Sequence, residues 1–267
     1  MLFYLSTIYA IWLREIKRSF RDSGQLTGAF IRPMLWVMIF GIGLTPYFSG
    51  GISESTFVVP FTYSQFILPA VAVLNVMYAA VQSGVSLIWD REFGFFREVF
   101  ASPAPRVAVF LGKLLGGATI ATLQGMLVLI LAPAADVPVS WRQGMLATLA
   151  LFGLAIVFSA FAIVIASRMS SFQGFGVFSN ALILPLYFLS SSVFPLDPSL
   201  SVEQQILIFP PWMVFAVRVN PITYIVDMLR GIMIDYHQFA PYLGSYVLLG
   251  LCAVLIPWAY REFQRRS

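Results

Sequence analysis

Long apolar runs separated by short polar connections occupy most of the sequence. A membrane-spanning helix needs about 20 mostly apolar residues, and six runs come close to or exceed that length. They do not alternate every second residue, as the strands of a membrane barrel would, so each is predicted to be a helix. The pattern predicts an all-α integral membrane protein whose single domain, residues 1–267, contains six transmembrane helices. They are placed at Ala29–Phe48, Gln65–Ile88, Val107–Leu131, Met145–Ser167, Gly174–Phe194 and Tyr242–Tyr260.

An amphipathic stretch precedes these runs. The apolar segment LFYLSTIYAIWL is too short to span a membrane and is followed by the basic segment REIKRSFRD. Aromatic residues such as Trp12 and cations such as Arg14 and Lys17 are typical of a helix that lies along a membrane surface. Residues 1–24 are therefore predicted to form an interfacial helix on the cytoplasmic side.

A charged aromatic segment, WDREFGFFREVFASPAPR at residues 89–106, separates the second and third runs. Phe93, Phe96 and Phe100 recur at positions i, i+3 and i+7, which places them on one face of a helix. The Ser-Pro-Ala-Pro sequence that follows would end this helix, so a short amphipathic helix is predicted at residues 89–102. It could lie passively on lipid. It could instead insert into a partner protein, for which aromatic residues and arginine are typical anchors.

The segment between the fifth and sixth runs, residues 195–241, is apolar but interrupted. Pro210 and Pro211 divide its stretch ILIFPPWMVFAV into pieces that are too short to span a membrane. Backbone of this kind is tolerated at membrane depth only where protein or a cavity surrounds it. A re-entrant or interfacial helical hairpin on the external side is therefore predicted.

Within this segment, NPITYIVDMLRG has the features of a short helix with defined ends. Asn220 is a good N-cap, Pro221 a good first helical residue and Gly231 a good C′ residue at which the helix would stop. Asp227 and Arg230 are three residues apart and could form an ion pair. A structural cap and a gate are equally compatible with this pattern.

Composition strengthens the prediction of a membrane protein. Hydrophobic residues make up 59% of the chain and charged residues 10%, against about 45–50% and about 25% in soluble domains. So few charges could not cover a water-exposed surface. The formal net charge of +4 is attributed to anionic lipid and membrane topology, and no nucleic-acid partner is expected.

The distribution of Lys and Arg predicts the orientation. With the N-terminus in the cytoplasm, thirteen of the 16 lie on or near the cytoplasmic side, and the other three, Arg142, Arg218 and Arg230, lie outside. Positive residues concentrate on the cytoplasmic side of membrane proteins. The count predicts a multi-pass protein of the cell (inner or plasma) membrane with both termini in the cytoplasm. It places residues 89–106 in the cytoplasm as well.

Motifs for catalysis are missing from the sequence. A P-loop requires G-x-x-x-x-G-K-[S/T], but Val107 stands at the first glycine position and Leu114 at the Ser/Thr position. With one cysteine and one histidine, no metal site is expected. The chain is therefore predicted to be neither an enzyme nor the carrier of a cofactor.

Polar side chains in the second run follow one helix face, at Asn75, Tyr78 and Gln82. In hydrocarbon such a face prefers a protein interface or a wet cavity, so a substrate path and interhelical hydrogen bonding are equally favoured. Gly112 and Gly116 form a G-x-x-x-G sequence. This spacing allows close helix approach and favours an intrachain contact over a dimer interface.

The segment REFGFFREVFASPAPRVAVFLGKLLGG closely resembles the stretch after the second span of ABC-2 type transporter permeases, which reads RE-x-G-T, then E-x-L-x-x-SP and later GK. VFPLDPSL and NPITYIVDMLRGIM resemble the FPL segment and the NP-L-T-Y-x-x-D-x-x-R-G signature of the same family. Size and motif style are most similar to the small drug-, lipid- or Nod-factor-export permeases, such as the daunorubicin type. Phe95 and Phe100 depart from the usual threonine and aliphatic residue.

The resemblance implies a mechanism. Two copies of the permease would join two ATPase subunits, which bind Mg-ATP, and residues 92–101 would form a coupling helix seated in each ATPase. The first, second and fifth spans would line an exit path for a hydrophobic or amphipathic small molecule or lipid. Export of lipid-linked polysaccharide, and a membrane scaffold without transport, are the alternatives.

Three sets of residues carry these implied roles. Contact with the ATPase is implied for Arg91, Glu92, Phe93, Phe96, Arg97, Glu98 and Phe100. A substrate path is implied for Asn75, Tyr78, Gln82 and Tyr187. The external re-entrant motif comprises Asn220, Pro221, Tyr224, Asp227, Arg230 and Gly231.

Overall fold

A computed structural model gives the fold and describes residues 2–43, 62–101, 104–193 and 201–266. Within these ranges the chain is helical apart from turns and short connections, and no strand occurs, which confirms the all-α prediction. The helices are α1 (Leu2–Arg21), α2 (Ser23–Trp36), η1 (Val37–Ile42), α4 (Tyr63–Glu92), α5 (Phe95–Ala101), α6 (Arg106–Leu129), η2 (Ala132–Ala135), α7 (Trp141–Arg168), α8 (Phe172–Phe188), α9 (Val202–Ile208), α10 (Pro211–Val219), α11 (Pro221–Ile234) and α12 (Leu243–Arg266).

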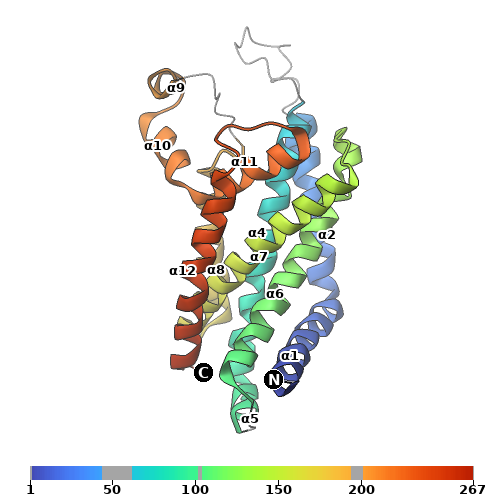
Figure 1. The fold of residues 1–267 in the computed structure, drawn as a ribbon, viewed down its shortest axis with the longest axis vertical. Coiled ribbons are helices and arrows are strands. Elements are labelled where there is room, and N and C mark those ends of the chain that lie inside the picture. Colours follow the sequence, from blue (N-terminus) through green and yellow to red (C-terminus); the bar gives the residue numbers. More distant parts are fainter. Residues whose placement is uncertain (1, 44–61, 102–103, 194–200, 267) are drawn as a thin grey trace.

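The helix α4 lies at the centre of the bundle, and α6 and α7 pack against it (Figure 1). Its side chains from Phe66 to Met77 are all buried, on every face of the helix, as expected of an apolar helix surrounded by others. The most apolar part of α12 is only 11% buried, so this helix presents its hydrophobic surface outward. Such an exposed apolar surface is typical of contact with lipid or another membrane protein.

Four helices, α4, α6, α7 and α12, are long and apolar enough to cross a membrane. They correspond to the second, third, fourth and sixth predicted spans. The fifth, Gly174–Phe194, is represented by α8, which has 17 residues and ends at Phe188; Phe194 lies outside the described residues. The first is represented by α2 and the π-helical η1, and positions 44–48 also lie outside the described residues.

The helix α2 begins at Ser23, earlier than the predicted Ala29, because Asp22 caps it. The Asp22 Oδ1 atom accepts a hydrogen bond of 3.0 Å from the backbone N–H of Gln25. An N-cap of this kind satisfies one of the amide groups that a helix start leaves unpaired. The N-terminal interfacial helix predicted at residues 1–24 therefore ends at Arg21, and a separate helix starts directly after it.

Close packing of α1 against α6 depends on two glycines. A Cβ atom at Gly112 would lie 2.7 Å from the Cβ of Ile11, and one at Gly116 would lie 2.8 Å from the Cβ of Glu15. Small residues allow two helix backbones to approach at such a distance. The G-x-x-x-G sequence thus serves an intrachain contact, as predicted.

The described part of the external segment contains three helices, α9, α10 and α11, rather than a single hairpin. The axes of α10 and α11 meet at an angle of 72°, as in a broken span or re-entrant loop. Asn220 lies at the bend and caps α11. In Figure 1 these helices lie at the opposite end of the molecule from α5 and both termini.

Candidate functional site

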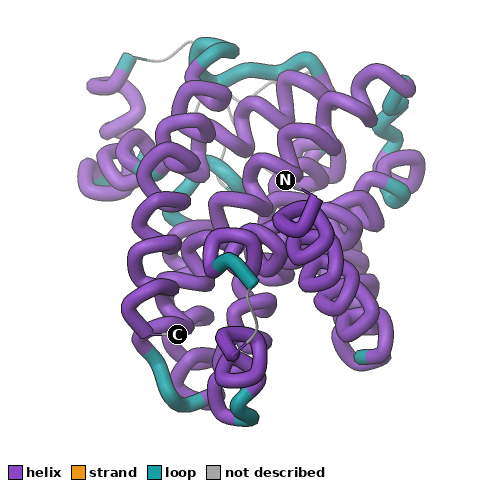
Figure 2. The backbone as a smooth tube through the Cα atoms, turned by 60° about the horizontal axis from the view of Figure 1, so that its bottom comes forward, coloured by secondary structure: helices purple, strands orange, loops and turns teal. Residues whose placement is uncertain are grey.

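The predicted continuous helix at residues 89–102 is wrong. The central helix α4 continues to Glu92, the chain turns at Phe93 and Gly94, and α5 starts at Phe95. Gly94 has a φ of +74°, a conformation that L-residues with a side chain rarely adopt. Residues 102 and 103 lie outside the described residues. The helix α5 projects at the end of the molecule where the two termini lie (Figures 1 and 2).

This turn separates the predicted phenylalanine stripe into two surfaces. Phe93 is 71% exposed, and its ring stacks on that of Trp89 with centroids 5.0 Å apart. Phe96 is only 4% exposed, and its ring meets Phe263 of α12 edge to face at 5.6 Å. Phe93 is therefore available to a partner, whereas Phe96 anchors α5 to the bundle. The side chain of Phe100 lies outside the described residues.

The predicted contact residues around the turn also differ in accessibility. Arg91 donates hydrogen bonds of 3.1, 2.8 and 3.2 Å to the backbone carbonyls of Ala166, Ser167 and Met169, at the C-terminal end of α7. The last carbonyls of a helix have no partner further along it, so Arg91 caps the end of α7, together with the backbone N–H of Met169, which donates to the Ala166 carbonyl. Glu92 and Glu98 are exposed, and the side chain of Arg97 lies outside the described residues.

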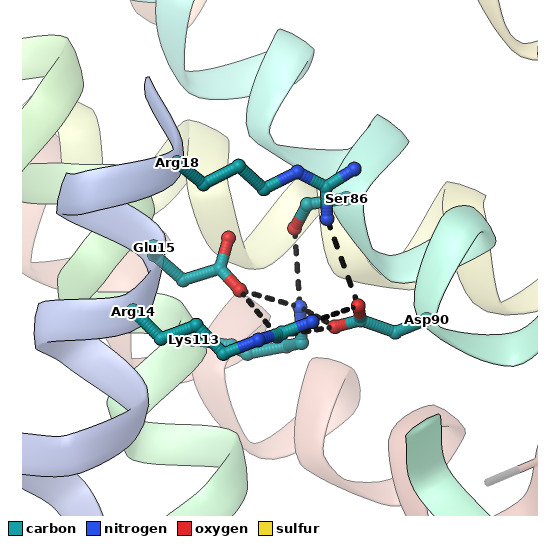
Figure 3. Close-up of polar contacts among 6 residues, drawn as sticks. All are labelled: Arg14, Glu15, Arg18, Ser86, Asp90 and Lys113. Carbon is teal, nitrogen blue, oxygen red and sulfur yellow. Dashed lines mark hydrogen bonds and ion pairs between the residues drawn. The ribbon is translucent and has the colours of Figure 1, made fainter. Parts of the chain in front are cut away.

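One turn of helix before Gly94, a buried ionic cluster joins three helices (Figure 3). Asp90 of α4 is 2% exposed. It accepts hydrogen bonds of 3.0 and 2.6 Å from both terminal nitrogens of Arg14 of α1, and its Oδ2 lies 2.5 Å from the Nζ of Lys113 of α6. Arg18 of α1 approaches it at 3.6 Å. A bidentate arginine–carboxylate pair combines strength with fixed geometry.

The cluster continues through Glu15 of α1. Its carboxylate lies 3.0 Å from the Nζ of Lys113 and 3.2 Å from Arg14, and Lys113 also lies 3.1 Å from the hydroxyl of Ser86. Three cations therefore share two carboxylates in a site where Lys113, Glu15 and Asp90 are buried. Burial opposes the charge on Arg14, but the hydrogen bond and negative charge of Asp90 outweigh it and raise the pKa of Arg14.

These contacts fix the end of α4, from which α5 projects, to the rest of the bundle. Asp90 lies four residues before Gly94, and its partners belong to α1 and α6. The end of α4 that precedes α5 is therefore fixed to two other helices. Sequence reasoning missed this cluster because it placed Arg14 in an interfacial helix and Asp90 in a separate cytoplasmic helix. A lysine within a predicted span, Lys113, was the available signal, because a charge there needs a partner.

The four residues predicted to line a substrate path do not converge. Asn75 is buried, and its Nδ2 donates hydrogen bonds of 3.3 Å to the Ala29 carbonyl and 2.8 Å to the Gln124 carbonyl, so it ties helices together. Tyr187 is fully buried elsewhere, at the end of α8. Tyr78 and Gln82 line a common cavity, of about 310 Å³, between α2, α4 and α6.

The external motif forms a set of caps. Asn220 accepts a hydrogen bond of 3.0 Å from the backbone N–H of Ile222 and donates one of 2.6 Å to the Leu186 carbonyl. Pro221 is the first residue of α11, as predicted. The Tyr224 hydroxyl donates a hydrogen bond of 2.6 Å to the Arg218 carbonyl. The motif thus fixes the bend between α10 and α11 and holds it against α8.

The predicted ion pair between Asp227 and Arg230 is not among the ion pairs of the described residues. The two side chains point to different partners. Asp227 accepts hydrogen bonds of 2.5 and 3.1 Å from the backbone N–H groups of Gln238 and Phe239. It therefore holds the connection that follows α11, a role that a spacing of three residues does not reveal.

Arg230 is completely buried and is surrounded by neutral acceptors. Its nitrogens donate hydrogen bonds of 3.2 Å to the Phe66 carbonyl, 2.9 Å to the Ser192 carbonyl and 3.4 Å to the Ser191 hydroxyl. The guanidinium also lies 3.5 Å from the centroid of the Phe66 ring, a cation–π contact. One side chain thus links α11 to the start of α4 and to the turn after α8.

Gly231 is not the C′ residue of α11, as the sequence predicted. The helix continues to Ile234, and Asp235 takes the left-handed conformation at its end, with a φ of 53°. A Cβ atom at Gly231 would lie 1.8 Å from Cε1 of His237. The glycine is therefore required by the ring that packs over it.

Replacing Gly231 with alanine is expected to destabilise the protein by about 1–3 kcal/mol, as overpacking usually does. The change should be measured by thermal unfolding of the purified protein. His237→Ala in the same chain removes the ring and should restore most of the stability. A single Gly231→Ala variant as stable as the unaltered protein would contradict this account.

Comparisons with known proteins identify relatives. Residues 6–234 match a family model described as ABC-2 type transporter. The putative transport permease ycf38 of Pyropia yezoensis is 24% identical over 232 residues, which cover 85% of this chain and 73% of that protein. The protein of the same name from Cyanophora paradoxa is 22% identical over 232 residues, covering 85% and 74%. The probable multidrug ABC transporter permease YbhR of Escherichia coli K12 is 26% identical over 208 residues, covering 76% and 53%.

Proposed function

The chain belongs to the ABC-2 type transporter family, and we propose that it is the membrane-spanning permease subunit of an ATP-binding-cassette exporter. Its apolar helices suit a subunit that spans the membrane. The sequence has no P-loop, so a separate ATPase subunit would bind and hydrolyse Mg-ATP. Two permease chains and two ATPase subunits would form the complete exporter.

The observation that carries this proposal is the projecting turn and helix at Phe93–Ala101. The side chain of Phe93 is exposed in this region, and so are those of Glu92 and Glu98. Aromatic residues that can be buried in a pocket often supply much of the energy of a protein interface. The turn would insert into a groove of the ATPase.

Movement of the ATPase would reach the membrane helices through contacts on the inner side of the turn. Phe96 holds α5 against α12, and Asp90 holds the end of α4 to α1 and α6. Because these groups are buried, α5 cannot tilt without carrying its neighbours. This arrangement would transmit a movement of the ATPase to the membrane helices. A helix that only rests on lipid would lack such contacts.

The orientation and cargo follow from the same proposal. The end of the molecule with α5 and both termini would face the cytoplasm of a cell that carries the protein in its inner or plasma membrane. The external motif at α10 and α11 would face outward. A hydrophobic or amphipathic small molecule or lipid would be moved out of the cytoplasm, in keeping with the Escherichia coli relative, which is named a probable multidrug ABC transporter permease.

Replacing Phe93 with alanine is expected to weaken binding of the ATPase at least about tenfold, because interface anchors commonly contribute about 2 kcal/mol or more. Stability should change by less than about 0.5 kcal/mol, since the side chain is exposed. Phe96→Ala should instead lower stability by about 3 kcal/mol, because it opens a cavity. Co-purification of the ATPase and thermal unfolding separate the two effects.

Phe215→Ala is the matched control, because Phe215 is 68% exposed on α10 at the opposite end of the molecule. It should leave ATPase binding unchanged. If a chain with Phe93, Glu92 and Glu98 all replaced by alanine still binds the ATPase and supports ATP-driven transport, the proposed coupling role is wrong.

A further inference from the structure

Two adjoining cavities open along α2, and they differ in character. The cavity of about 310 Å³ between α2, α4 and α6 is lined by polar side chains that include Arg32, Tyr78, Gln82 and Gln124. The second, of about 560 Å³, is lined by Ile31, Leu35 and Trp36 and is mainly apolar. Both are lined by Gly24, Gly28 and Arg32, so the two cavities meet along one stripe of the helix.

Arg32 lies where the two cavities meet. It follows Ser23, the first residue of α2, by nine positions, which corresponds to about 14 Å along a helix. Its guanidinium lies 4.7 Å from the centroid of the Tyr78 ring. Among the described residues no carboxylate pairs with it. A cation within an apolar span is costly and usually marks a pathway for substrate or ions.

Gln124 gives a second, independent indication of a ligand. Its side chain is buried and lines the polar cavity, yet its Nε2 group has no hydrogen-bond partner. Buried polar groups are nearly always paired, so a buried donor without a partner, on a residue that lines a cavity, points to an acceptor supplied by a ligand. The carboxylate of Asp22 also lines this cavity, and its Oδ1 accepts the N–H of Gln25 and so caps α2.

We propose that the two cavities form the binding site for an amphipathic substrate with an anionic headgroup. Phosphate or carboxylate oxygens would accept hydrogen bonds from Arg32 and Gln124 in the polar cavity, and an apolar chain would lie against Ile31, Leu35 and Trp36. This inference rests on the proposed function, because it names the class of substrate that the permease moves. Arg32 selects the negative charge, and the apolar cavity selects the chain.

Gly28 offers a way to block this site without disturbing the fold. A Cβ atom at Gly28 would meet nothing within 4 Å, so the stripe shared by the two cavities is open there. A leucine side chain at this position would fill the open space and raise helix propensity. Gly250 of α12 is the matched control, because a Cβ atom there also meets nothing within 4 Å.

Binding can be measured on the purified full-length permease through Trp36, which lines the apolar cavity. Lysophosphatidic acid with a brominated chain should quench Trp36 fluorescence. The same titration of the Trp36→Phe variant measures the quenching of the other tryptophans, which is then subtracted. We expect this lipid to bind at least about tenfold more tightly than brominated lysophosphatidylcholine. Inorganic phosphate alone should not displace it at millimolar concentration, which separates a lipid headgroup from a free anion.

Variants then test which residues cause the preference for the anionic lipid. Gly28→Leu should abolish quenching of Trp36 by the anionic lipid, and Gly250→Leu should not. Arg32→Gln should remove the preference for the anionic headgroup, whereas Arg142→Gln, at an exposed position on α7, should retain it. Equal binding of the two lipids by the unaltered protein would overturn the inference, and this result does not depend on any variant folding.

Failure of the proposed binding site and failure of the proposed exporter function would give different results. Selective binding without ATP-driven movement in the complex with the ATPase would refute the exporter proposal and leave the site standing. ATP-driven transport of amphiphiles with no dependence on headgroup charge or on Arg32 would refute the site and leave the exporter proposal standing. Displacement of the lipid by inorganic phosphate would overturn the assignment of an amphipathic ligand.

Discussion

Replacing Asp90 with alanine is expected to lower the free energy of unfolding by about 3–5 kcal/mol, the usual cost of removing one partner from a buried ionic group. The variant would leave Arg14, Arg18 and Lys113 around the single carboxylate of Glu15. Lys113 is 5% exposed, so water cannot take the place of the lost partner. Thermal or denaturant unfolding of the purified permease would measure the loss.

A double replacement tests whether the cost comes from unpaired charge. Asp90→Leu together with Lys113→Met removes both buried charges, and apolar residues of similar volume can replace a buried pair at little cost. It should therefore be clearly more stable than Asp90→Ala. Arg142→Ala is the control, because Arg142 is exposed on α7 and surface substitutions usually change stability by less than about 0.5 kcal/mol.

Transport measured with the ATPase present would show what the charges do beyond stability. We expect the double variant to fold but to transport poorly, because apolar side chains cannot reproduce the hydrogen bonds that fix α1 and α6 to the end of α4. Full transport by the double variant would mean that packing alone transmits movement from α5. Asp90→Ala with unaltered stability would contradict the cluster itself.

The long helices could be predicted because hydrophobic length is a local property. Apolar runs of about 20 residues locate α4, α6, α7 and α12, with ends that differ from those of the helices by one to six residues. The ionic cluster could not be predicted in this way, since Asp90 lies 76 positions from Arg14, and Lys113 lies 98 positions from Glu15. Only the packing of three helices brings these charges together.

Glycines were misread for a related reason. The sequence around Gly94 fits a continuous amphipathic helix, and a single glycine within one costs only about 1 kcal/mol, so the break was not apparent. Gly231 fits a helix stop equally well. In the structure Gly94 takes a positive φ and ends α4, whereas Gly231 lies inside α11 under the ring of His237. The difference depends on tertiary contacts.

The same limit applies to the residues assigned to the partner and to the substrate. A helical stripe shows which side chains share a face, but not whether that face is buried. Phe96 turned out to lie against α12 and Asn75 between helices, whereas Arg32, assigned only to the basic count, lies between two cavities. Whether a side chain is accessible to a partner or substrate depends on how the helices pack, which the sequence pattern does not show.

Replacing Arg230 with alanine is expected to cost about 3 kcal/mol, because it leaves a cavity and deprives buried acceptors of their donors. The loss should concentrate at the outer end of the bundle, where Arg230 links α11 to the Phe66 carbonyl of α4 and the Ser192 carbonyl after α8. Hydrogen exchange of these segments would locate it. Arg142→Ala, at an exposed position of α7, serves as the control.

Arg230→Lys distinguishes the two contributions of the guanidinium. A lysine keeps the positive charge over the Phe66 ring but lacks the planar fork that reaches acceptors on two elements at once. We expect it to recover less than half of the lost stability, with faster hydrogen exchange at the start of α4 and at the end of α8. Stability equal to that of the unaltered protein would show that charge over the ring suffices. In that case the carbonyl contacts would not hold the outer ends of these helices together.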